Sequence, residues 1–330
     1  MGVTIQQIAE KTGVSKATVS RVLNGLAVKY ETEQKIKAMM EKLQYRPHRF
    51  ARGLANRQTG FLGVLTPSMD PFIAAIMAGM ELEARKFGKL LTLGVIPESA
   101  EADEEREVVR TITEPPVVDG LLFFLPTQQS ESLLRNLIRK KFPLVVLCER
   151  RYEHLASSVV IDNFDGAKQA TRHLIQKGHK RIGFITGRPE LSDSTERFEG
   201  YKQALSEAGI TFDPSLVQAG RYTVQSGIEA ASKFLSMPQP PTAVFAANDA
   251  MAIGFLKMLH ERKKEGTIAV VGFDDIEMAS LVSPSLTTVS YDLNELGRQA
   301  IHKLMRLVTG EEKTRSVLQL KANLVTRESA

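Results

Sequence analysis

The sequence predicts a multi-domain chain with an all-α helix-turn-helix headpiece and a larger α/β body. Apolar side chains recur at helical spacing around a glycine turn within the first 45 residues. From residue 61, short apolar runs alternate with amphipathic stretches, which is typical of parallel sheets covered by helices on both faces. The chain has 330 residues, more than one compact core usually holds, so we expect two or three domains.

The headpiece begins with two short helices joined by a turn at Gly13, a residue that tolerates the tight backbone. Thr4 and Gln7 have the spacing of a capping box, and Ser15 can cap the second helix. Val19 points inward, which leaves on the outer face Lys16, Ala17, Thr18, Ser20 and Arg21. Such a face suits the DNA major groove, where an Arg fork bonds guanine and a small methyl contacts thymine. An ordinary helical hairpin is the alternative.

A third helix and a strong charge asymmetry favour the DNA interpretation. Ile36, Met39, Met40 and Leu43 have helical spacing and can close a three-helix core. Residues 1–60 hold 11 Lys and Arg against 4 Asp and Glu, whereas the remaining 270 residues hold 32 against 34. A basic head on a neutral body is typical of a module that binds phosphates.

Several motifs together resemble the lactose-repressor (LacI) family of bacterial transcription regulators. They cover nearly the whole chain in the family's order: Thr4 to Gly25, Tyr45-Arg46-Pro47, Ala51 to Leu54, Gly178 to Gly183, Arg197 to Tyr201, Ala247 to Gly254, Gly272 to Asp275, Pro284 to Val289 and Leu324 to Ser329. The DNA-binding residues that follow are Thr4, Ser15, Lys16, Ala17, Thr18, Ser20, Arg21, Asn24, Thr32, Arg46, Phe50, Ala51, Leu54 and Ala55. Lys16, Ala17 and Arg21 are expected to read bases.

Within this set, the resemblance implies that residues 48–60 form a hinge. Leu54 would wedge into the minor groove and kink the duplex, as apolar side chains do there. Gly53 costs roughly 0.5–1 kcal/mol of helix stability relative to Ala, so we expect the hinge to be disordered without DNA. A flexible linker whose leucine packs on the body is the alternative. The third helix departs from the family pattern, because Lys29 and Tyr30 stand where a Ser or Thr cap is usual.

The domain organisation follows from the strand–helix alternation and from the resemblance, which implies a periplasmic-binding-protein-like clamshell of two doubly wound parallel-sheet lobes. We expect a headpiece at 1–47, a hinge at 48–60 and an effector-binding and dimerisation body at 61–330. Its N-lobe would comprise about 61–160 and 291–320, and its C-lobe about 161–290 and 321–330. Strands are predicted at 61–66, 90–96, 120–125, 144–148, 159–161, 181–186, 243–246 and 268–273. Helices are predicted at 72–88, 129–141, 164–177, 195–208, 223–236, 249–262 and 292–309.

Such sheets bind ligands beyond the carboxyl ends of their strands, so the cleft between the lobes is the expected effector site. In the LacI family the residues matching Arg197, Asn248 and Asp274 bind effector hydroxyls. Tyr222 stands where relatives present an aromatic ring. Further candidates lie at strand ends and in a loop: Asp70, Phe72, Glu149, Arg150 and Asp193. Helix capping or surface ion pairing is the alternative for each, and for Asn248 an N-cap in particular.

Composition and motifs exclude several other classes. No apolar run reaches the roughly 20 residues of a membrane span, and the N-terminus lacks a signal-peptide core. The single cysteine, Cys148, excludes an internal disulfide framework and fits a reducing cytoplasm. No nucleotide-binding, zinc-protease or serine-hydrolase motif is present, so we expect no enzyme, no cofactor and no metal. A transport-type solute-binding protein shares the clamshell but would need export and no basic head.

The sequence therefore predicts a cytoplasmic homodimer that binds near-palindromic double-stranded operator DNA and a small-molecule effector, without a membrane. The function expected is repression of carbohydrate uptake or catabolic genes in response to a sugar or sugar derivative. Nucleosides and purines are the second effector class. Arg150, Arg151 and Arg197 leave room for an anionic sugar. The chain ends directly after its last strand without the heptad tail of tetrameric relatives, which favours a dimer.

Overall fold

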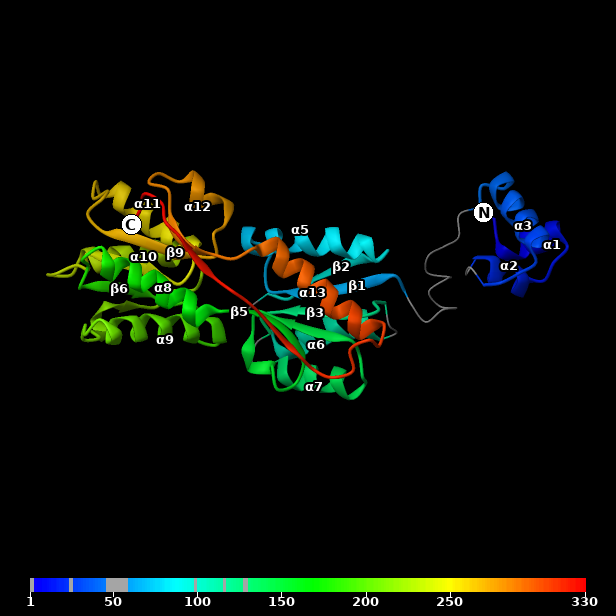
Figure 1. The fold of residues 1–330 in the computed structure, drawn as a ribbon, viewed down its shortest axis with the longest axis horizontal. Coiled ribbons are helices and arrows are strands. Elements are labelled where there is room, and N and C mark those ends of the chain that lie inside the picture. The colour runs from blue at the N-terminus through cyan, green and yellow to red at the C-terminus, as the bar shows by residue number, and fades with distance from the viewer. Residues whose placement is uncertain (1–2, 24–25, 46–58, 98–99, 115–116, 127–129) are drawn as a thin grey trace.

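The computed structural model describes residues 3–23, 26–45, 59–97, 100–114, 117–126 and 130–330 (Figure 1). Six of the predicted DNA contacts lie outside these residues: Asn24, Arg46, Phe50, Ala51, Leu54 and Ala55.

The headpiece is a three-helix unit with a core of its own. Its helices are α1 (Ile5–Thr12), α2 (Lys16–Leu23) and α3 (Tyr30–Lys42). The predicted capping box is present, because Thr4 accepts from the Gln7 amide and the Gln7 side chain accepts from the Thr4 amide. Gly13 ends α1 at φ 67°, the left-handed conformation that glycine adopts without strain. Ile8, Val19 and Ile36, one from each helix, are fully buried together.

The N-lobe is a parallel sheet covered on both faces. Its strand order is β11 (Val317–Leu320), β5 (Ser157–Ile161), β4 (Leu144–Leu147), β3 (Leu121–Phe124), β1 (Phe61–Thr66) and β2 (Leu90–Val95). One face packs on α5 (Pro71–Lys86) and α13 (Leu293–Val308), the other on α6 (Ala102–Thr113) and α7 (Glu131–Arg139). Along β3, Leu122 and Phe124 join the first core while Leu121 and Phe123 join the second. The continuous apolar runs of the sequence therefore reflect burial on two sides.

The C-lobe repeats this plan with one antiparallel edge. Its strand order is β12 (Asn323–Val325), β10 (Thr287–Ser290), β9 (Ala269–Phe273), β8 (Ala243–Ala246), β6 (Ile182–Ile185) and β7 (Val217–Gln218). Its helices are α8 (Asn163–Gln176) packed with α9 (Ser192–Glu207), α10 (Val224–Leu235) packed with α11 (Asp249–Glu261), and the short α12 (Glu277–Leu281). Strand β12 pairs antiparallel with β10 at the edge of this otherwise parallel sheet. The direction reverses because the chain re-enters this lobe directly from β11 of the other lobe.

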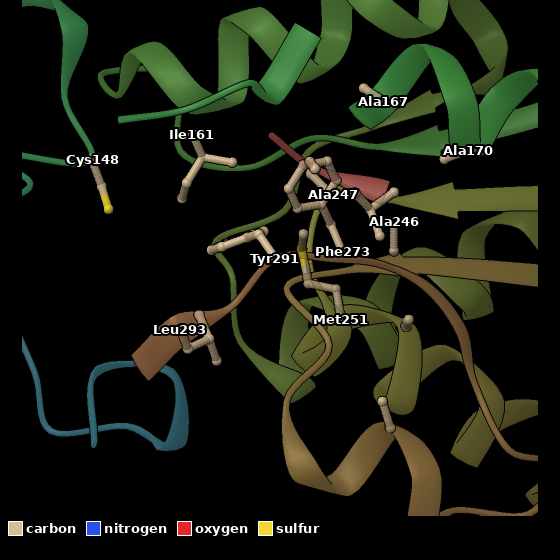
Figure 2. Packing of buried hydrophobic residues seen from close by; sticks show 14 of the residues in the cluster. Cys148, Ile161, Ala167, Ala170, Ala246, Ala247, Met251, Phe273, Tyr291 and Leu293 are labelled. Carbon is tan, nitrogen blue, oxygen red and sulfur yellow. The ribbon is translucent and has the colours of Figure 1, made fainter. Parts of the chain in front are cut away.

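The chain passes between the lobes three times, after β5, after β10 and after β11. Tyr291 lies at the second crossing and is buried. Its ring is 6.2 Å from that of Phe273, and in Figure 2 it lies between Phe273 and Leu293 at the start of α13. The lobes thus share a continuous apolar core beneath the cleft. Among the described residues, no helix combines the length and apolar character that crossing a membrane requires.

Candidate functional site

The outer face of α2 presents the side chains predicted to read DNA. Lys16, Ala17 and Arg21 are exposed, and Thr18 and Ser20 are half-buried beside them. Ser15 caps the helix, because its hydroxyl accepts a 3.1 Å hydrogen bond from the Thr18 amide.

Helix α3 begins differently. Lys29 occupies its N-cap position and makes no side-chain capping bond, as the departure from the family pattern indicated. Thr32 lies in the first turn of α3 and is half-buried. Amide groups at a helix start that the N-cap side chain does not engage can bind an anion such as a phosphate.

A cavity of about 120 Å³ lies between the lobes at the carboxyl ends of the strands. The N-lobe lines it with Pro67, Ser68, Asp70, Pro71, Phe72, Ile73 and Leu125. The C-lobe lines it with Arg188, Leu191, Asp193, Arg197, Tyr222, Asn248, Ala250, Asp274 and Ile276. Seven of the nine predicted effector-binding residues therefore meet at one place, where α/β sheets bind ligands.

Arg197 is the centre of the polar wall. It projects from the second turn of α9 and is buried, so its guanidinium needs partners on every side. Its Nε donates to Asn163 Oδ1 at 2.9 Å, Nη1 donates to the Ala247 carbonyl, and Nη2 lies 3.3 Å from Asp274 Oδ1. The guanidinium carbon also lies 3.8 Å from the centre of the Phe273 ring. Burial lowers the pKa of Arg197, but Asp274 together with Tyr222, Asp193 and Tyr291 outweighs it and raises this pKa, so the group stays charged.

Asp274 follows β9 with φ 106°, a left-handed conformation that is unusual for aspartate. This backbone turns the carboxylate back towards the cleft, where Tyr291 donates to Oδ1 at 2.9 Å. Burial raises the pKa of Asp274 to about 7, and Arg197 and the Tyr291 hydroxyl act in the opposite direction. Near neutral pH this carboxyl group therefore accepts or loses a proton readily, which makes it sensitive to a ligand that donates hydrogen bonds.

Tyr222 forms the aromatic side of the cavity and is held in an uncommon conformation. Its φ is 62°, and its hydroxyl donates to Asp193 Oδ1 at 2.9 Å. The ring lies directly over Gly187, where a Cβ atom would be 2.0 Å from Tyr222 Cζ. The Tyr222 ring can therefore occupy this position only because residue 187 is a glycine. Asn248 donates to the Tyr222 carbonyl at 3.2 Å and fixes its backbone.

Two residues of the cavity wall are also helix caps, which is the alternative that the sequence left open for them. Asn248 Oδ1 accepts from the Met251 amide at 3.0 Å and caps α11. Asp70 accepts from the Ile73 amide at 3.0 Å and caps α5. Capping fixes each side chain at the rim of the cleft, so a structural role and a place in the cavity wall coexist.

Glu149 and Arg150 are not among the residues that line the cavity. Glu149 is fully buried and accepts from the Arg151 amide at 2.8 Å and the Ser192 amide at 3.0 Å. Arg150 Nε lies 2.7 Å from Glu196 Oε1. Both residues belong to the N-lobe and contact the start of α9 in the C-lobe, so they join the lobes.

The structure also changes the local setting of Asp193 and adds residues to the site. Asp193 lies in the first turn of α9, not in a preceding loop, because α9 begins three residues earlier than predicted. Sequence reasoning missed Ser68, Leu125 and Arg188. Each follows the end of a strand (β1, β3 and β6), so the rule that selected Asp70 and Asp274 would have found them.

Comparison with known proteins agrees with both parts of this geometry. Residues 4–48 match the model of bacterial regulatory proteins of the lacI family, and residues 171–330 match that of a periplasmic binding protein-like domain. The HTH-type transcriptional repressor PurR of Photobacterium profundum is 33% identical over 331 residues, which cover 99% of this chain and 98% of that protein. The chain belongs to the lacI family. It is a DNA-binding transcriptional regulator of that family.

Solved structures of the lacI family extend the likeness to the fold. A lac repressor dimer bound to operator and the anti-inducer ONPF matches with a TM-score of 0.87 and 28% identity over 100% of this chain and 99% of that one. A complex of the transcriptional regulator CelR with cellobiose matches with a TM-score of 0.76 and 29% identity, covering 99% and 100%. The predicted family, headpiece and two-lobed body are confirmed.

Proposed function

We propose that the protein is a cytoplasmic, homodimeric repressor of carbohydrate uptake or catabolic genes, controlled by a sugar or sugar derivative in the cleft. Residues 1–47 would bind operator DNA, 48–60 would form the hinge, and 61–330 would bind the effector and dimerise. Ligand binding would shift the angle between the lobes and thereby the operator affinity, which couples two distinct sites through one two-state element.

The observation that carries the sugar proposal is the pairing of polar and aromatic walls in one cavity. Arg197, Asp193 and Asp274 offer donors and acceptors suited to several hydroxyl groups. Phe72 and Tyr222 supply ring faces that pack on the apolar C–H face of a pyranose. A mostly apolar pocket with few convergent polar groups is the usual form of a small-molecule site. The CelR–cellobiose complex is a relative with a bound sugar.

The charges of the cleft favour a neutral effector over a sugar acid or sugar phosphate. Arg150 is engaged by Glu196, and Arg151 Nη2 donates to the Glu190 carbonyl at 2.5 Å, so both are committed to contacts between the lobes. Arg197 is matched by Asp274, and Arg188, which also lines the cavity, has its Nε 2.9 Å from Glu190 Oε1. A nucleoside or purine is the second candidate, because the same rings, Phe72 and Tyr222, can stack a base.

Exposed apolar side chains support the homodimer. They gather on α5 and β2 of the N-lobe and on α12 of the C-lobe, and Leu82 and Leu281 are 58% and 67% exposed. The others on or next to these elements are Met69, Phe87, Leu90, Leu93, Val95 and Met278. A second copy that covers them would remove apolar surface from water, which is the usual meaning of such patches.

A thermal-shift screen of sugars, sugar phosphates, nucleosides and purines tests this proposal. We expect a neutral sugar to raise the melting temperature of the wild type and to have no effect on Arg197→Ala, which removes the centre of the polar wall. Arg135→Ala, a change on an exposed face of α7, is the matched control and should respond like the wild type. A shift produced only by nucleosides, or equally strong in Arg197→Ala, would contradict the sugar proposal.

A further inference from the structure

A buried carboxylate holds the chain where it enters the body. Thr59 and Gly60 are the last residues before β1, and they end the segment 48–60 that was predicted as hinge. Asp119, which immediately precedes the turn into β3, accepts hydrogen bonds from both. The Thr59 amide and hydroxyl donate to its Oδ1, the hydroxyl at 3.0 Å, and the Gly60 amide donates to its Oδ2 at 2.9 Å. We call these contacts the exit clamp.

A lysine completes the clamp from a second element. Lys89, between α5 and β2, places Nζ 2.8 Å from Asp119 Oδ2. The side chains of Lys89 and Asp119 are only 9% and 3% exposed. Burial alone would raise the pKa of Asp119, but Lys89 and the amides of Thr59 and Gly60 outweigh it and hold this pKa below its ordinary value. The carboxylate is therefore charged and saturated with donors at neutral pH.

Backbone hydrogen bonds next to the clamp join the starts of three adjacent strands, β2, β1 and β3. The Leu90 amide donates to the Gly60 carbonyl at 3.0 Å, and the Asp119 amide donates to the Phe61 carbonyl at 2.7 Å. Gly60 adopts φ 82°, so the chain turns sharply as it enters β1. All of these groups lie at the amino ends of β1, β2 and β3, opposite the carboxyl ends that line the cavity.

We propose that Asp119, together with Lys89, is a positioning residue for DNA binding. It fixes the point and the direction in which the chain leaves the N-lobe towards the headpiece. The clamp makes this exit part of the rigid N-lobe sheet, so a rotation of the N-lobe moves the exit with it. In a dimer, which is part of the proposed function, the two exits then set the separation of the two headpieces.

If Asp119 acts as a positioning residue, loss of the clamp should affect specific and non-specific DNA binding differently. A near-palindromic operator requires both headpieces at a fixed spacing, because each recognition helix must reach its own half-site. Binding to unrelated DNA depends mainly on the charges of the headpiece and is sequence-independent. Loss of the clamp should therefore reduce operator affinity while leaving non-specific affinity in place, whereas general unfolding would reduce both.

The test uses the full-length protein and an operator that the wild type selects from random-sequence DNA. Asp119→Asn keeps the shape of the side chain but removes the charge that Lys89 and the two amides surround. Asp213→Asn is the matched control, because Asp213 also accepts from a backbone amide and a hydroxyl, both of Ser215, and pairs with an arginine, Arg181, but lies in the C-lobe. Dissociation constants are measured for the operator and for a scrambled duplex of equal length.

We expect Asp119→Asn to weaken operator binding roughly tenfold or more, the effect of removing a charged hydrogen-bond partner, and to leave scrambled-DNA binding within about threefold. Asp213→Asn should change neither. Thr59→Val leaves the ion pair between Lys89 and Asp119 intact and removes one hydroxyl. If Asp119→Asn folds poorly, this variant replaces it in the test. We expect Thr59→Val to lose about threefold in operator affinity. The proposal would be overturned if Thr59→Val and folded Asp119→Asn both bound the operator within twofold of wild type. Equal losses of affinity for the operator and for the scrambled duplex would also overturn it.

Discussion

Arg150 and Glu196 offer a direct measure of how firmly the two lobes hold each other. Arg150 follows β4 in the N-lobe, Glu196 lies on α9 in the C-lobe, and their Nε and Oε1 atoms are 2.7 Å apart. Arg150 also contacts Glu153 within its own lobe at 2.9 Å. Arg150→Gln removes both ion pairs, whereas Glu196→Gln removes only the one between the lobes. The double mutant therefore isolates the interlobe interaction.

The burial of the Arg150–Glu196 pair determines the size of the coupling free energy that we expect. The two side chains are 26% and 23% exposed, between a surface pair and a core pair. Exposed ion pairs contribute about 0.2–1 kcal/mol, and hydrogen bonds to charged groups about 1.5–3 kcal/mol. We therefore expect a coupling free energy of about 1–2 kcal/mol between the two positions. It should favour the arrangement of the lobes seen here.

Chemical denaturation of the wild type, both single variants and the double variant gives this coupling free energy. Spin labels on one introduced cysteine in α7 and one in α10 report the distance between the lobes. The native Cys148 is buried, and burial raises the pKa of its thiol, so it should not compete for the label. Additive single effects within about 0.3 kcal/mol, with an unchanged distance distribution, would refute the reasoning.

Three further predictions concern the recognition helix and the cavity. Arg21→Ala should weaken operator binding by about 1–3 kcal/mol and relax the preference at one base pair per half-site, as measured by competition with randomised operators; an equal loss on all sequences would make Arg21 a phosphate contact. Gly187→Ala should displace the Tyr222 ring from Asp193 and lower the free energy of unfolding by about 1–3 kcal/mol. That cost should vanish in a Tyr222→Ala background, and its persistence would contradict the packing argument. The pKa of Asp274 lies near 7, above its ordinary 3.8, so its protonated form stabilises the fold and this contribution is lost as the pH rises. Relative to Asp274→Asn, the wild type should therefore lose up to about 4 kcal/mol of unfolding free energy between about pH 4 and 8, and a pH-independent difference would contradict it.

Much of the body could be predicted because its central strands are buried on both faces. The runs that became β3, β4 and β8 contain only apolar residues, and no other element explains such runs between turns. The predicted strands did not include β7, β10, β11 and β12, and β10 is buried but reads Thr-Thr-Val-Ser, which is not an apolar run. Strand β7 has two residues, and β11 exposes alternate side chains at the edge of its sheet. Helix α6 was missed because it is strongly charged and has few apolar residues, although Val109 and Thr113 lie buried on one face.

The candidate site was predictable only as far as strand ends determine it. A position at the end of a strand predicts where the backbone of a residue lies, but it does not predict which groups its side chain contacts. Asp274 and Glu149 both follow buried strands, yet Asp274 lines the cavity while Glu149 accepts from the Ser192 amide at the start of α9. That choice depends on the position of the other lobe, which local sequence does not encode. The left-handed backbone of Tyr222 likewise depends on its ring packing over Gly187.

The measurement that tests the account most directly is operator affinity with and without the ligand found by the thermal-shift screen. Fluorescence anisotropy of a labelled operator, at one fixed salt concentration, gives both dissociation constants. We expect the ligand to change the affinity of the wild type by at least about fivefold, the lower range of allosteric coupling. Arg197→Ala should bind the operator but show no change. The same affinity in both conditions for the wild type, or a full response in Arg197→Ala, would contradict control of DNA binding from this cavity.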